Sequence, residues 1–533
     1  MDEIIGRGTW YDKIASEIVK REKELGRSLD NIRVESGVAA SGIPHIGSLG
    51  EVTRNYAVSL ALREQGQNSE FIVFSDNKDG LRSVPRGLPR SMEKYVGFPV
   101  TDVPDPFQCH GSYADHMVNL LLEALDKIGI EYRFMSAAEA YKGGLLNDEI
   151  TLILEKASRI GEIVKEETGQ EKYMKVLPYF PVCASCGRIY TTVAYEFHPK
   201  ERRVSYICEG MEVKGRWLEG CGYEGDAKYE KGEGKLSWKA GEFAARWRAL
   251  KIRFEAYGKD LADSVAVNDR ICREILGYEP PMHVQYELFL DKSGKKISKS
   301  VGNVLTPQVW FRYGSPQSLV LLTLKRFVGT RQISVTDIPR YMDELDQLED
   351  LYFGRRKVED QKESIKMRGL YWYCFLAKPP EKPSVHVPYN VLTCLARVAP
   401  KGSEKSFIIE KLRNYGYIRE QFTQELETRI NYALNWVQDF KEEPVISVDI
   451  SPSEKKAVEE LAKIIQEEDD AQKIQTAVFN VAKSNGIPPK RFFEILYLLL
   501  IGSPSGPRFG PYVLDIGKEN AAKLLKSRLQ EKS

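Results

Sequence analysis

The fold is decided by residues 31–75, which read NIRVESGVAASGIPHIGSLGEVTRNYAVSLALREQGQNSEFIVFS. Residues 31–37, with the β-branched Ile32 and Val34, and residues 70–75, rich in β-branched and aromatic side chains, are predicted to form two buried strands. Between them, residues 51–65 carry apolar side chains at helical spacing, and the pattern stops at Gly66. A strand, a helix and a second strand with short connections make a βαβ unit, so we expect a parallel sheet.

Composition sets the class of protein. The chain has 533 residues, 42% of them hydrophobic and 29% charged, so it is long enough for several folded domains. Lys and Arg total 77 against 76 Asp and Glu, a net charge of +1, which excludes a uniformly basic nucleic-acid coat but permits local basic faces. The longest apolar run, 495–501, is too short to span a membrane, and residues 1–7 lack the pattern of a secretory signal. We therefore expect a cytoplasmic protein with no membrane partner.

A candidate phosphate-binding turn follows the first strand and contains Pro44-His45-Ile46-Gly47-Ser48. Helix N-termini at the carboxyl edge of a parallel sheet present N–H groups and a positive dipole end to anions. Gly47 would let a ligand approach the backbone, and His45 can donate to phosphate oxygens. Read alone, such a motif is more typical of an ordinary turn.

A second candidate is the stretch Lys295-Lys296-Ile297-Ser298-Lys299-Ser300, preceded by the turn residues 291–294. Lys296 and Lys299, with Ser298 between them, suit a mobile loop that closes over a polyphosphate. Placed ammonium groups stabilise the charge that develops on leaving pyrophosphate. Read alone, a cluster of lysine and serine is more typical of a solvated surface loop.

Together the two motifs resemble the signatures of class I aminoacyl-tRNA synthetases, His-Ile-Gly-His and Lys-Met-Ser-Lys-Ser. Ser48 stands in place of the second histidine, which removes any role of a second imidazole, and Ile297 stands in place of methionine. Further stretches are similar to the lysine-specific branch of that class and extend the resemblance over nearly the whole chain: 76–82, 102–110, 238–247, 254–260 and 502–511. Residues 241–243 are Gly-Glu-Phe where the branch has Asp-Trp-Pro, so no role is carried over to them.

The resemblance implies a Rossmann-type doubly wound parallel sheet with a zinc-binding insertion, followed by a helical C-terminal anticodon-binding domain. Glycines and four cysteines mark the insertion near residues 172–235, and helical patterns dominate after residue 361. The expected domains are the first half of the Rossmann sheet with a metal cluster at 1–170, the zinc-binding insertion at 171–235, the second half with the signature loop at 236–304, a stem-contact linking domain at 305–360 and the anticodon-binding domain at 361–533.

The same resemblance implies a monomeric enzyme that joins L-lysine to tRNA(Lys) through a lysyl-adenylate, using ATP and Mg²⁺. The residues carried over are His45 and Gly47 for the ATP phosphates, Lys296, Ser298 and Lys299 for the departing pyrophosphate, and Gly258 and Asp260 for the ribose side. Three alternatives stay open: an arginyl or glutamyl enzyme of the same class, a small-molecule nucleotidyltransferase, and a non-catalytic zinc-containing RNA-binding protein.

Residues at the carboxyl ends of the predicted strands are candidates for binding lysine: Glu35, Gly37, Asp76 and Asp79. Acids that crowd the edge of a triphosphate site are costly unless a cation occupies the pocket. Glu35 is our first choice for the partner of the ε-ammonium group, because it lies closest in sequence to the phosphate motif. The alternative is a salt bridge from Glu35 to Arg33 or to another surface base.

One group of cysteines has the composition of a structural zinc site. Cys183 and Cys186 form a Cys-x-x-Cys knuckle, which Cys208 and Cys221 would complete, with His198 in reserve. A small glycine-rich insertion has little core, so zinc would supply much of its folding energy. The alternative is a set of free buried thiols.

A second group of zinc-ligand types lies close together in the first half of the chain and comprises Asp105, Cys109, His110 and His116. We expect a second Zn²⁺ site there. In the alternative, His116 lies on a helix face and Cys109 packs in the core.

Overall fold

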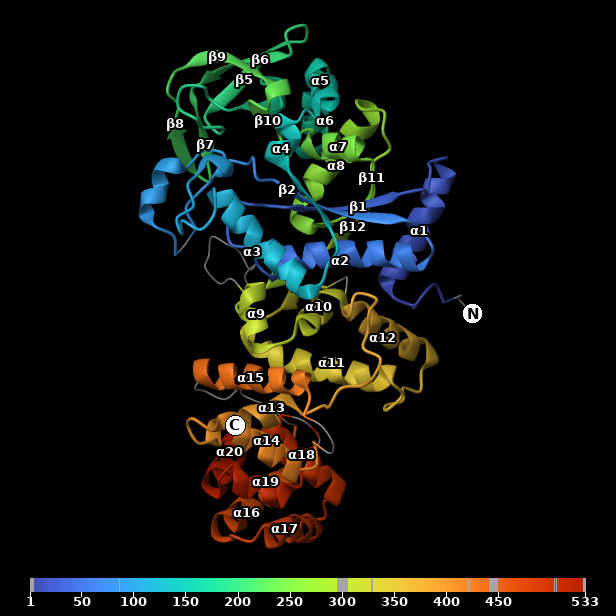
Figure 1. The fold of residues 1–533 in the computed structure, drawn as a ribbon, viewed down its shortest axis with the longest axis vertical. Helices are drawn as coiled ribbons and strands as arrows, with labels where there is room; N and C mark the ends of the chain where they lie inside the picture. The colour runs from blue at the N-terminus through green and yellow to red at the C-terminus, as the bar shows by residue number, and fades with distance from the viewer. Residues whose placement is uncertain are drawn as a thin grey trace. The chain divides into compact units, whose positions relative to one another are not determined.

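The described residues of the computed structural model are 4–85, 87–294, 305–326, 329–418, 422–440, 449–502, 504 and 506–530. They divide into two compact units, drawn in Figure 1. Unit 1 comprises Met1–Gln308, Leu319–Ser334 and Lys357–Pro379, and unit 2 comprises Val309–Ser318, Val335–Arg356 and Pro380–Ser533. Within the described ranges, no helix is both long and apolar enough to cross a membrane.

Unit 1 is built on a five-stranded sheet with the strand order β12-β11-β1-β2-β3. The strands are β1 (Ile32–Val38), β2 (Ser69–Ser75), β3 (Arg133–Ser136), β11 (Ile252–Gly258) and β12 (Met282–Tyr286). Every neighbouring pair is parallel, and the β1–β2 register runs from Ile32 opposite Ser69 to Val38 opposite Ser75. The predicted parallel sheet is confirmed.

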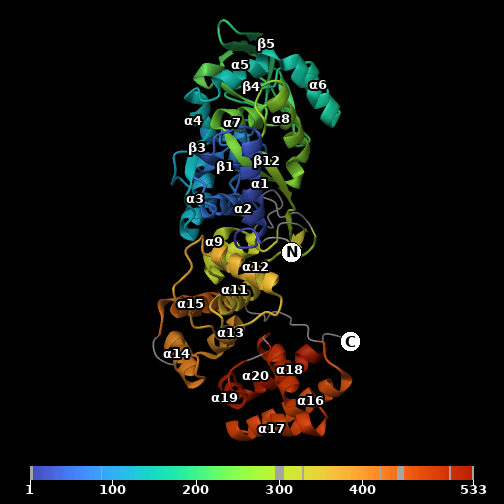
Figure 2. The same ribbon diagram turned by 90° about the vertical axis from the view of Figure 1, so that its right-hand side faces the viewer.

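Helices cover both faces of this sheet, which is why its central strands β1, β2 and β11 are buried along nearly their whole length. Figures 1 and 2 show α2 and α3 on one face and α7 and α8 on the other. The helices of unit 1 are α1 (Trp10–Glu24), α2 (Ile46–Glu64), α3 (Tyr113–Ile128), α4 (Ala137–Lys142), α5 (Asn147–Glu155), α6 (Ala157–Thr168), α7 (Glu242–Leu250), α8 (Ala262–Glu274) and α12 (Gln361–Cys374). A short parallel pair, β13 (Phe289–Leu290) and β14 (Arg331–Gln332), also belongs to unit 1.

The strand order places a crevice at the carboxyl ends of β1 and β11. From β1 the chain proceeds through β2 to β3 on one side, and it later adds β11 and β12 on the other side of β1. The connections that leave β1 and β11 therefore diverge, and ligands of doubly wound sheets bind at such a point.

The insertion between α6 and α7 forms small antiparallel sheets. One sheet pairs β4 (Tyr179–Pro181) with β10 (Gly234–Leu236). A second has β6 (Arg203–Cys208) between β5 (Thr192–His198) and β9 (Glu224–Lys228). The third is the hairpin of β7 (Gly210–Val213) and β8 (Arg216–Glu219). One of its buried clusters consists of Cys183, Tyr206, Cys208 and Ala227, with Cys186 packed against it. Sulfur atoms thus occupy the place that a larger apolar core would fill.

In the described part of unit 2 the regular structure is helical. Its helices are α11 (Ile338–Tyr352), α13 (Tyr389–Val398), α14 (Glu404–Asn414), α15 (Gln424–Asp439), α16 (Pro452–Glu467), α17 (Ala471–Ser484), α18 (Pro489–Ile501), α19 (Phe509–Asp515) and α20 (Lys518–Gln530). The chain passes between the units at α9 (Pro307–Tyr313) and α10 (Pro316–Leu324). The core of unit 2 consists of buried apolar side chains such as Leu395, Leu461 and Leu496.

Candidate active site and metal clusters

His45 caps the N-terminus of α2, at the position predicted for phosphate binding. Its Nδ1 accepts hydrogen bonds from the N–H groups of Gly47 at 3.0 Å and Ser48 at 3.4 Å. Because Nδ1 is the acceptor, the neutral imidazole carries its proton on Nε2, which is the tautomer that can donate to a phosphate oxygen. A Cβ on residue 47 would lie 2.7 Å from Cε1 of His45, so this cap requires glycine there.

The two ribose-side candidates lie together at the end of β11. Gly258 is the last residue of the strand, and a Cβ there would lie 2.9 Å from Oδ1 of Asp260. The predicted loop residues Lys296, Ser298 and Lys299 lie outside the described residues. In the turn just before them, Gly294 has φ +79° and its N–H donates to the Asp291 carbonyl at 2.9 Å, so a glycine suits this position.

Arg246 of α7 lies among three carboxylates: Glu35 and Glu255 come from the middle of β1 and β11, not from the strand ends predicted for Glu35, and Asp76 follows β2. Its Nε contacts Glu35, its Nη1 lies 3.3 Å from Oδ1 of Asp76, and its Nη2 lies 3.3 Å from Oε1 of Glu255. The Arg246 side chain is 2% exposed and that of Glu35 is fully buried. Burial raises the pKa of Glu35 well above its usual range, and Arg246 opposes that rise. Two buried acids, Glu35 and Glu255, and the partly exposed Asp76 therefore share one guanidinium group.

Gly37 makes room for this arrangement. A Cβ on residue 37 would lie 3.0 Å from Nη2 of Arg246, and the Gly37 N–H donates to Oε1 of Glu255 at 3.3 Å. The base that pairs with Glu35 is thus Arg246, whereas Arg33 pairs with Glu70 at 2.8 Å. The carboxylate chosen from the sequence to meet an ε-ammonium group is already held by the protein's own cation.

Asp79 belongs to a neighbouring group of ion pairs. Its carboxylate contacts Lys235 and lies 3.4 Å from Arg82, and Lys235 also lies 2.9 Å from Glu242. Of the four residues predicted to bind lysine, the structure therefore brings Glu35, Gly37 and Asp76 together around Arg246 and places Asp79 with a different base.

A cavity of about 50 Å³ opens beside Arg246, at the carboxyl edge of the sheet. Its aromatic walls are Phe243, Trp247, Tyr257 and His283, and the acids that line it are Glu51, Asp76 and Glu255. Trp247 donates from Nε1 to Oε2 of Glu255 at 2.5 Å, so both oxygens of Glu255 are engaged by the protein. Aromatic side chains and carboxylates line the cavity together, which suits a ligand that carries a positive charge on an apolar group.

Glu51 is the lining acid that sequence reasoning missed. Its Oε2 accepts a hydrogen bond from the Tyr286 hydroxyl at 2.8 Å, and among the residues that the structure describes no basic group lies within 4 Å of its carboxylate. Burial raises the pKa of Glu51 to about 8. A glutamate inside a helical pattern is typical of a surface position. Glu51 could have been found from its position, because it lies in the second turn of α2, the helix that follows the predicted phosphate motif.

The four predicted cysteines of the insertion lie together. The Sγ atoms of Cys183 and Cys221 are 3.6 Å apart, those of Cys186 and Cys208 are 3.7 Å apart, and all four lie within 4.8 Å of one another. Four thiolates at about 2.3 Å from a zinc ion in a tetrahedron would lie about 3.8 Å apart, so the donor set fits zinc. His198 is not in this group, because its Nε2 lies 2.8 Å from the hydroxyl of Ser205.

The second predicted group is also assembled, just before and within the first turn of α3. Its four ligand atoms, from Asp105, Cys109, His110 and His116, lie within 4.8 Å of one another. The sulfur and the two Nδ1 atoms are each 3.2 Å apart. The N–H groups of Cys109 and His110 donate to Oδ2 of Asp105 at 2.9 Å and hold its carboxylate in place. A carboxylate, a thiol and two imidazoles at this spacing also fit zinc.

Comparison with known proteins identifies the family of this chain. The family model of the tRNA synthetases class I (K) matches residues 8–371. A lysine--tRNA ligase of Cenarchaeum symbiosum (strain A) is 45% identical over 529 residues, covering 99% of this chain and all of that protein. A lysine--tRNA ligase of Methanosphaera stadtmanae is 29% identical over 555 residues, covering 98% of this chain and 99% of that protein. A solved glutamate-tRNA synthetase from Elizabethkingia anophelis, 14% identical with a TM-score of 0.33, covers 94% of this chain and all of that one, and we draw nothing from it. With a family model that spans most of its length and a full-length relative at 45% identity, the chain belongs to the tRNA synthetases of class I (K).

Proposed function

We propose that this protein is a lysine--tRNA ligase, which joins L-lysine to tRNA(Lys) with cleavage of ATP to AMP and pyrophosphate. The observation that carries the proposal is the acidic cavity at the carboxyl edge of the sheet, in a chain whose full-length relatives are lysine--tRNA ligases. Three acids share one guanidinium, and burial raises the pKa of Glu35 and Asp76, so a cationic amino acid in the cavity would stabilise their charged forms.

The reaction has two steps, and atoms balance in each. The lysine carboxylate attacks the α-phosphate of ATP, forming the mixed anhydride lysyl-adenylate while pyrophosphate leaves with the electrons of the broken P–O bond. A hydroxyl of the terminal ribose of the tRNA then attacks the carbonyl carbon, giving the ester and AMP. Because no bond to the enzyme is needed, catalysis consists of placement and electrostatic stabilisation.

The residues predicted for the nucleotide keep their proposed roles. His45 would donate from Nε2 to a phosphate oxygen, Gly47 preserves the cap that orients the imidazole, and Gly258 with Asp260 would contact the ribose. Mg²⁺, when bound, would neutralise charge on the triphosphate. Lys296, Ser298 and Lys299 would act on the departing pyrophosphate from the loop outside the described residues.

On the amino-acid side we propose Glu51 as the partner of the ε-ammonium group. Glu35 has its own cation in Arg246, so its proposed role becomes that of fixing Arg246 at the cavity wall. Asp76 shares Arg246 as well, and Glu51 accepts only a neutral hydroxyl from Tyr286 among the described contacts. A glutamyl specificity is less well supported, because a second carboxylate would enter an already acidic cavity.

The proposed function is tested by ATP–pyrophosphate exchange with each of the twenty amino acids, with and without tRNA. Exchange that depends on lysine is the expected result. Exchange that depends on arginine or glutamate would replace the proposed substrate, and RNA binding without exchange for any amino acid would support the non-catalytic alternative. An exchange unaffected by any RNA, with no transfer to tRNA, would support a small-molecule nucleotidyltransferase.

We further propose that both donor groups bind Zn²⁺. The purified protein is then expected to contain about two zinc ions per chain, and Cys183→Ser should lower the zinc content and the thermal stability of the insertion. Cys272→Ser is the matched control, because Cys272 is a buried thiol of α8 outside both groups. Metal analysis of the native protein and both variants measures the zinc content per chain. Zinc retained in full after loss of all four insertion cysteines would assign the metal to the Asp105 group alone, and a native protein free of zinc would remove both sites.

The domain limits at 170, 235, 304 and 360, the monomeric state and the cytoplasmic location also remain proposals. The support for the insertion limits is that the small antiparallel sheets, β4 to β10, all fall between residues 171 and 236. Equilibrium sedimentation of the full chain would test the monomeric state, for which a single species of 60.7 kDa is expected.

A further inference from the structure

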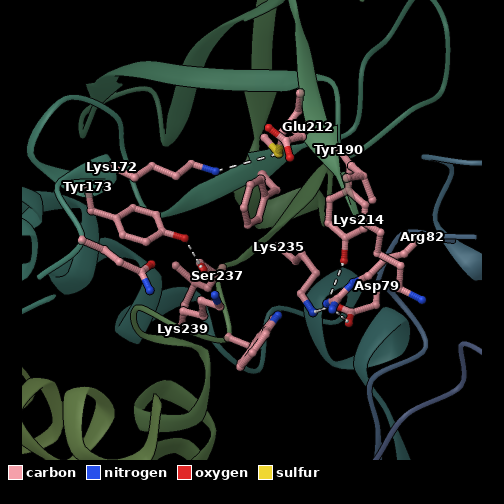
Figure 3. A pocket seen from close by; sticks show the side chains of 16 residues that line it. Asp79, Arg82, Lys172, Tyr173, Tyr190, Glu212, Lys214, Lys235, Ser237 and Lys239 are labelled. Atoms are coloured by element: carbon pink, nitrogen blue, oxygen red, sulfur yellow. Dashed lines mark hydrogen bonds and ion pairs between the residues drawn. The ribbon is translucent and has the colours of Figure 1, made fainter. Parts of the chain in front are cut away.

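Arg54 of α2 is a buried cation with no acid beside it among the described residues. Its residue is 2% exposed, and no carboxylate in the described part of the chain lies within 4 Å of its guanidinium. The buried basic side chains that do have a carboxylate within 4 Å are Lys235, Arg246, Arg253 and Arg429. Figure 3 shows one such contact, between Lys235 and Asp79. Because a buried charge without a counter-charge is costly, Arg54 must be stabilised in another way.

Two aromatic rings and one carbonyl group lie around the guanidinium of Arg54. Its Cζ is 4.6 Å from the ring centre of Tyr286 and 5.5 Å from that of Phe289, and its Nη1 donates to the Gly50 carbonyl at 3.0 Å. A Cβ on residue 50 would lie 2.9 Å from Nη1, so glycine leaves the room that the guanidinium occupies. Burial lowers the pKa of Arg54 to about 10, so the group still carries its charge at neutral pH. An apolar side chain would fill this space without the cost of burying a charge, which indicates that the charge itself has a role.

The phenol of Tyr286 connects this cation to the amino-acid cavity. Its hydroxyl donates to Oε2 of Glu51 at 2.8 Å, while its ring lies against the guanidinium of Arg54. A cation over a phenol ring stabilises negative charge on the phenol oxygen, which makes the hydroxyl a stronger donor. Burial raises the pKa of Tyr286 well above its usual range, and Arg54 opposes that rise. A stronger donor in turn favours the carboxylate form of Glu51 over the neutral acid.

The Tyr286 hydrogen bond is the main influence that favours the charged form of Glu51. Burial raises the pKa of Glu51 most, and the carboxylates of Glu255 in β11 and Asp260 just after β11 raise it further. The bond from Tyr286 lowers that pKa more than Arg246 of α7 does, and Arg246 is shared by three other acids. The other titratable side chains in the cavity wall are Asp76, Tyr257 and His283.

We propose that Arg54 is a positioning residue for the amino-acid substrate, which acts through the phenol of Tyr286 to ease the ionisation of Glu51 that a cationic side chain requires. The inference rests on the proposed function, because it takes Glu51 to meet the ε-ammonium group of lysine. When lysine binds, the proton of Glu51 passes to solvent and no other bond changes. Arg54 does not line the cavity, so its effect on lysine is indirect.

The test follows the pH dependence of lysine activation in ATP–pyrophosphate exchange. Arg54→Met replaces the guanidinium side chain with an unbranched apolar one. Its Michaelis constant for lysine should rise about tenfold near neutral pH, and the fall of that constant with rising pH should move up by about one pH unit, since one unit of pKa is a tenfold change in the equilibrium. The constant for ATP should stay unchanged. Arg54→Lys keeps a positive charge and should restore most of the wild-type profile.

Tyr286→Phe tests the route through the phenol. This variant keeps the ring beside Arg54 but removes the hydroxyl, so it should shift the profile in the same direction. Adding Arg54→Met to it should cause little further change, because the two residues act in one chain of contacts. A full additional shift in the double variant would overturn the route through Tyr286. If Arg54→Met does not fold, Tyr286→Phe carries the test, and a wild-type profile in that variant would overturn the proposal.

The matched control is Arg63→Met in the same helix. The guanidinium of Arg63 also lies over a tyrosine ring, 5.9 Å from the centre of that of Tyr56, but Arg63 is outside the cavity wall and should leave the profile unchanged. If Arg54→Met weakens lysine binding without moving the pH profile, or changes both Michaelis constants equally, its role is structural and the proposal is wrong. A wild-type protein without lysine-dependent exchange would instead contradict the proposed function, and that result is obtained before the variants are made.

Discussion

Replacing Glu51 with glutamine is expected to raise the Michaelis constant for lysine by about two to four orders of magnitude, while that for ATP stays nearly unchanged. The variant keeps the shape and the hydrogen bond from Tyr286 but removes the negative charge. Loss of one partner of a buried ion pair typically costs about 3–5 kcal/mol, which corresponds to that change in affinity. Pyrophosphate exchange at varied lysine and at varied ATP, under otherwise identical conditions, measures both constants.

Two matched variants sharpen this test. Glu51→Asp keeps the charge and should recover part of the lysine affinity. Norleucine, which lacks the ε-amine, should compete no worse in Glu51→Gln than in the wild type. If Glu51→Gln binds lysine normally and loses ATP, Glu51 belongs to the nucleotide site. In that case Asp76, which also lines the cavity, becomes the leading candidate for the ammonium partner.

Because the pKa of Glu51 is raised, we expect the Michaelis constant for lysine to change with pH in a definite direction. In the free enzyme the carboxyl group holds its proton below about pH 8, because burial disfavours the charged form. Lysine requires the carboxylate, so its binding must release that proton at neutral pH. The Michaelis constant for lysine should therefore fall as pH rises from 7 toward 8, and Glu51→Gln should lose this trend. A wild-type profile that is flat over this interval would contradict the assignment.

Replacing Arg246 with alanine is expected to lower the free energy of unfolding by about 3–5 kcal/mol, because it leaves buried carboxylates without their cation. Glu35 is fully buried and Asp76 and Glu255 lie nearby, so their mutual repulsion is no longer opposed. Denaturant unfolding of the wild type and the variant at neutral pH measures the difference. Amino-acid activation should be lost as well, since Arg246 also lines the cavity.

The pH dependence of this loss separates an electrostatic cause from simple loss of packing. The pKa values of Glu35 and Asp76 are already raised by burial, and removal of Arg246 raises them further. A folded-state acid with a raised pKa binds more protons than the unfolded chain, so stability increases as pH falls through that pKa. The deficit of Arg246→Ala should therefore shrink toward acid pH, and Arg246→Lys should show a smaller deficit throughout. A deficit that is the same at every pH would indicate lost packing alone.

Local patterns predicted much of this molecule. The predicted strand, helix and strand of residues 31–75 are present as β1, α2 and β2. They could be predicted because the spacing of apolar residues in each segment depends on which of its side chains are buried in the sheet. The four cysteines of the insertion and the four residues from Asp105 to His116 are both assembled. Within the second group, close spacing in sequence almost guarantees proximity. In the cysteine group of the insertion, the Cys-x-x-Cys spacing of Cys183 and Cys186 indicated a metal site.

The pairing of charges in the candidate site was decided only by tertiary structure. Glu35 and Arg246 are far apart in sequence, and nothing in the neighbourhood of either residue indicates that α7 would bring this arginine to the end of β1. Arg33 lies two residues before Glu35 on the same face of β1, but it pairs with Glu70, the residue opposite it on β2. The sequence by itself predicted the parallel sheet and the two groups of candidate metal ligands that the structure brings together. Which acid lacks a base, and is therefore open to a cationic substrate, depended on packing between distant segments, since an ion pair forms wherever the fold places two charges within a few ångströms.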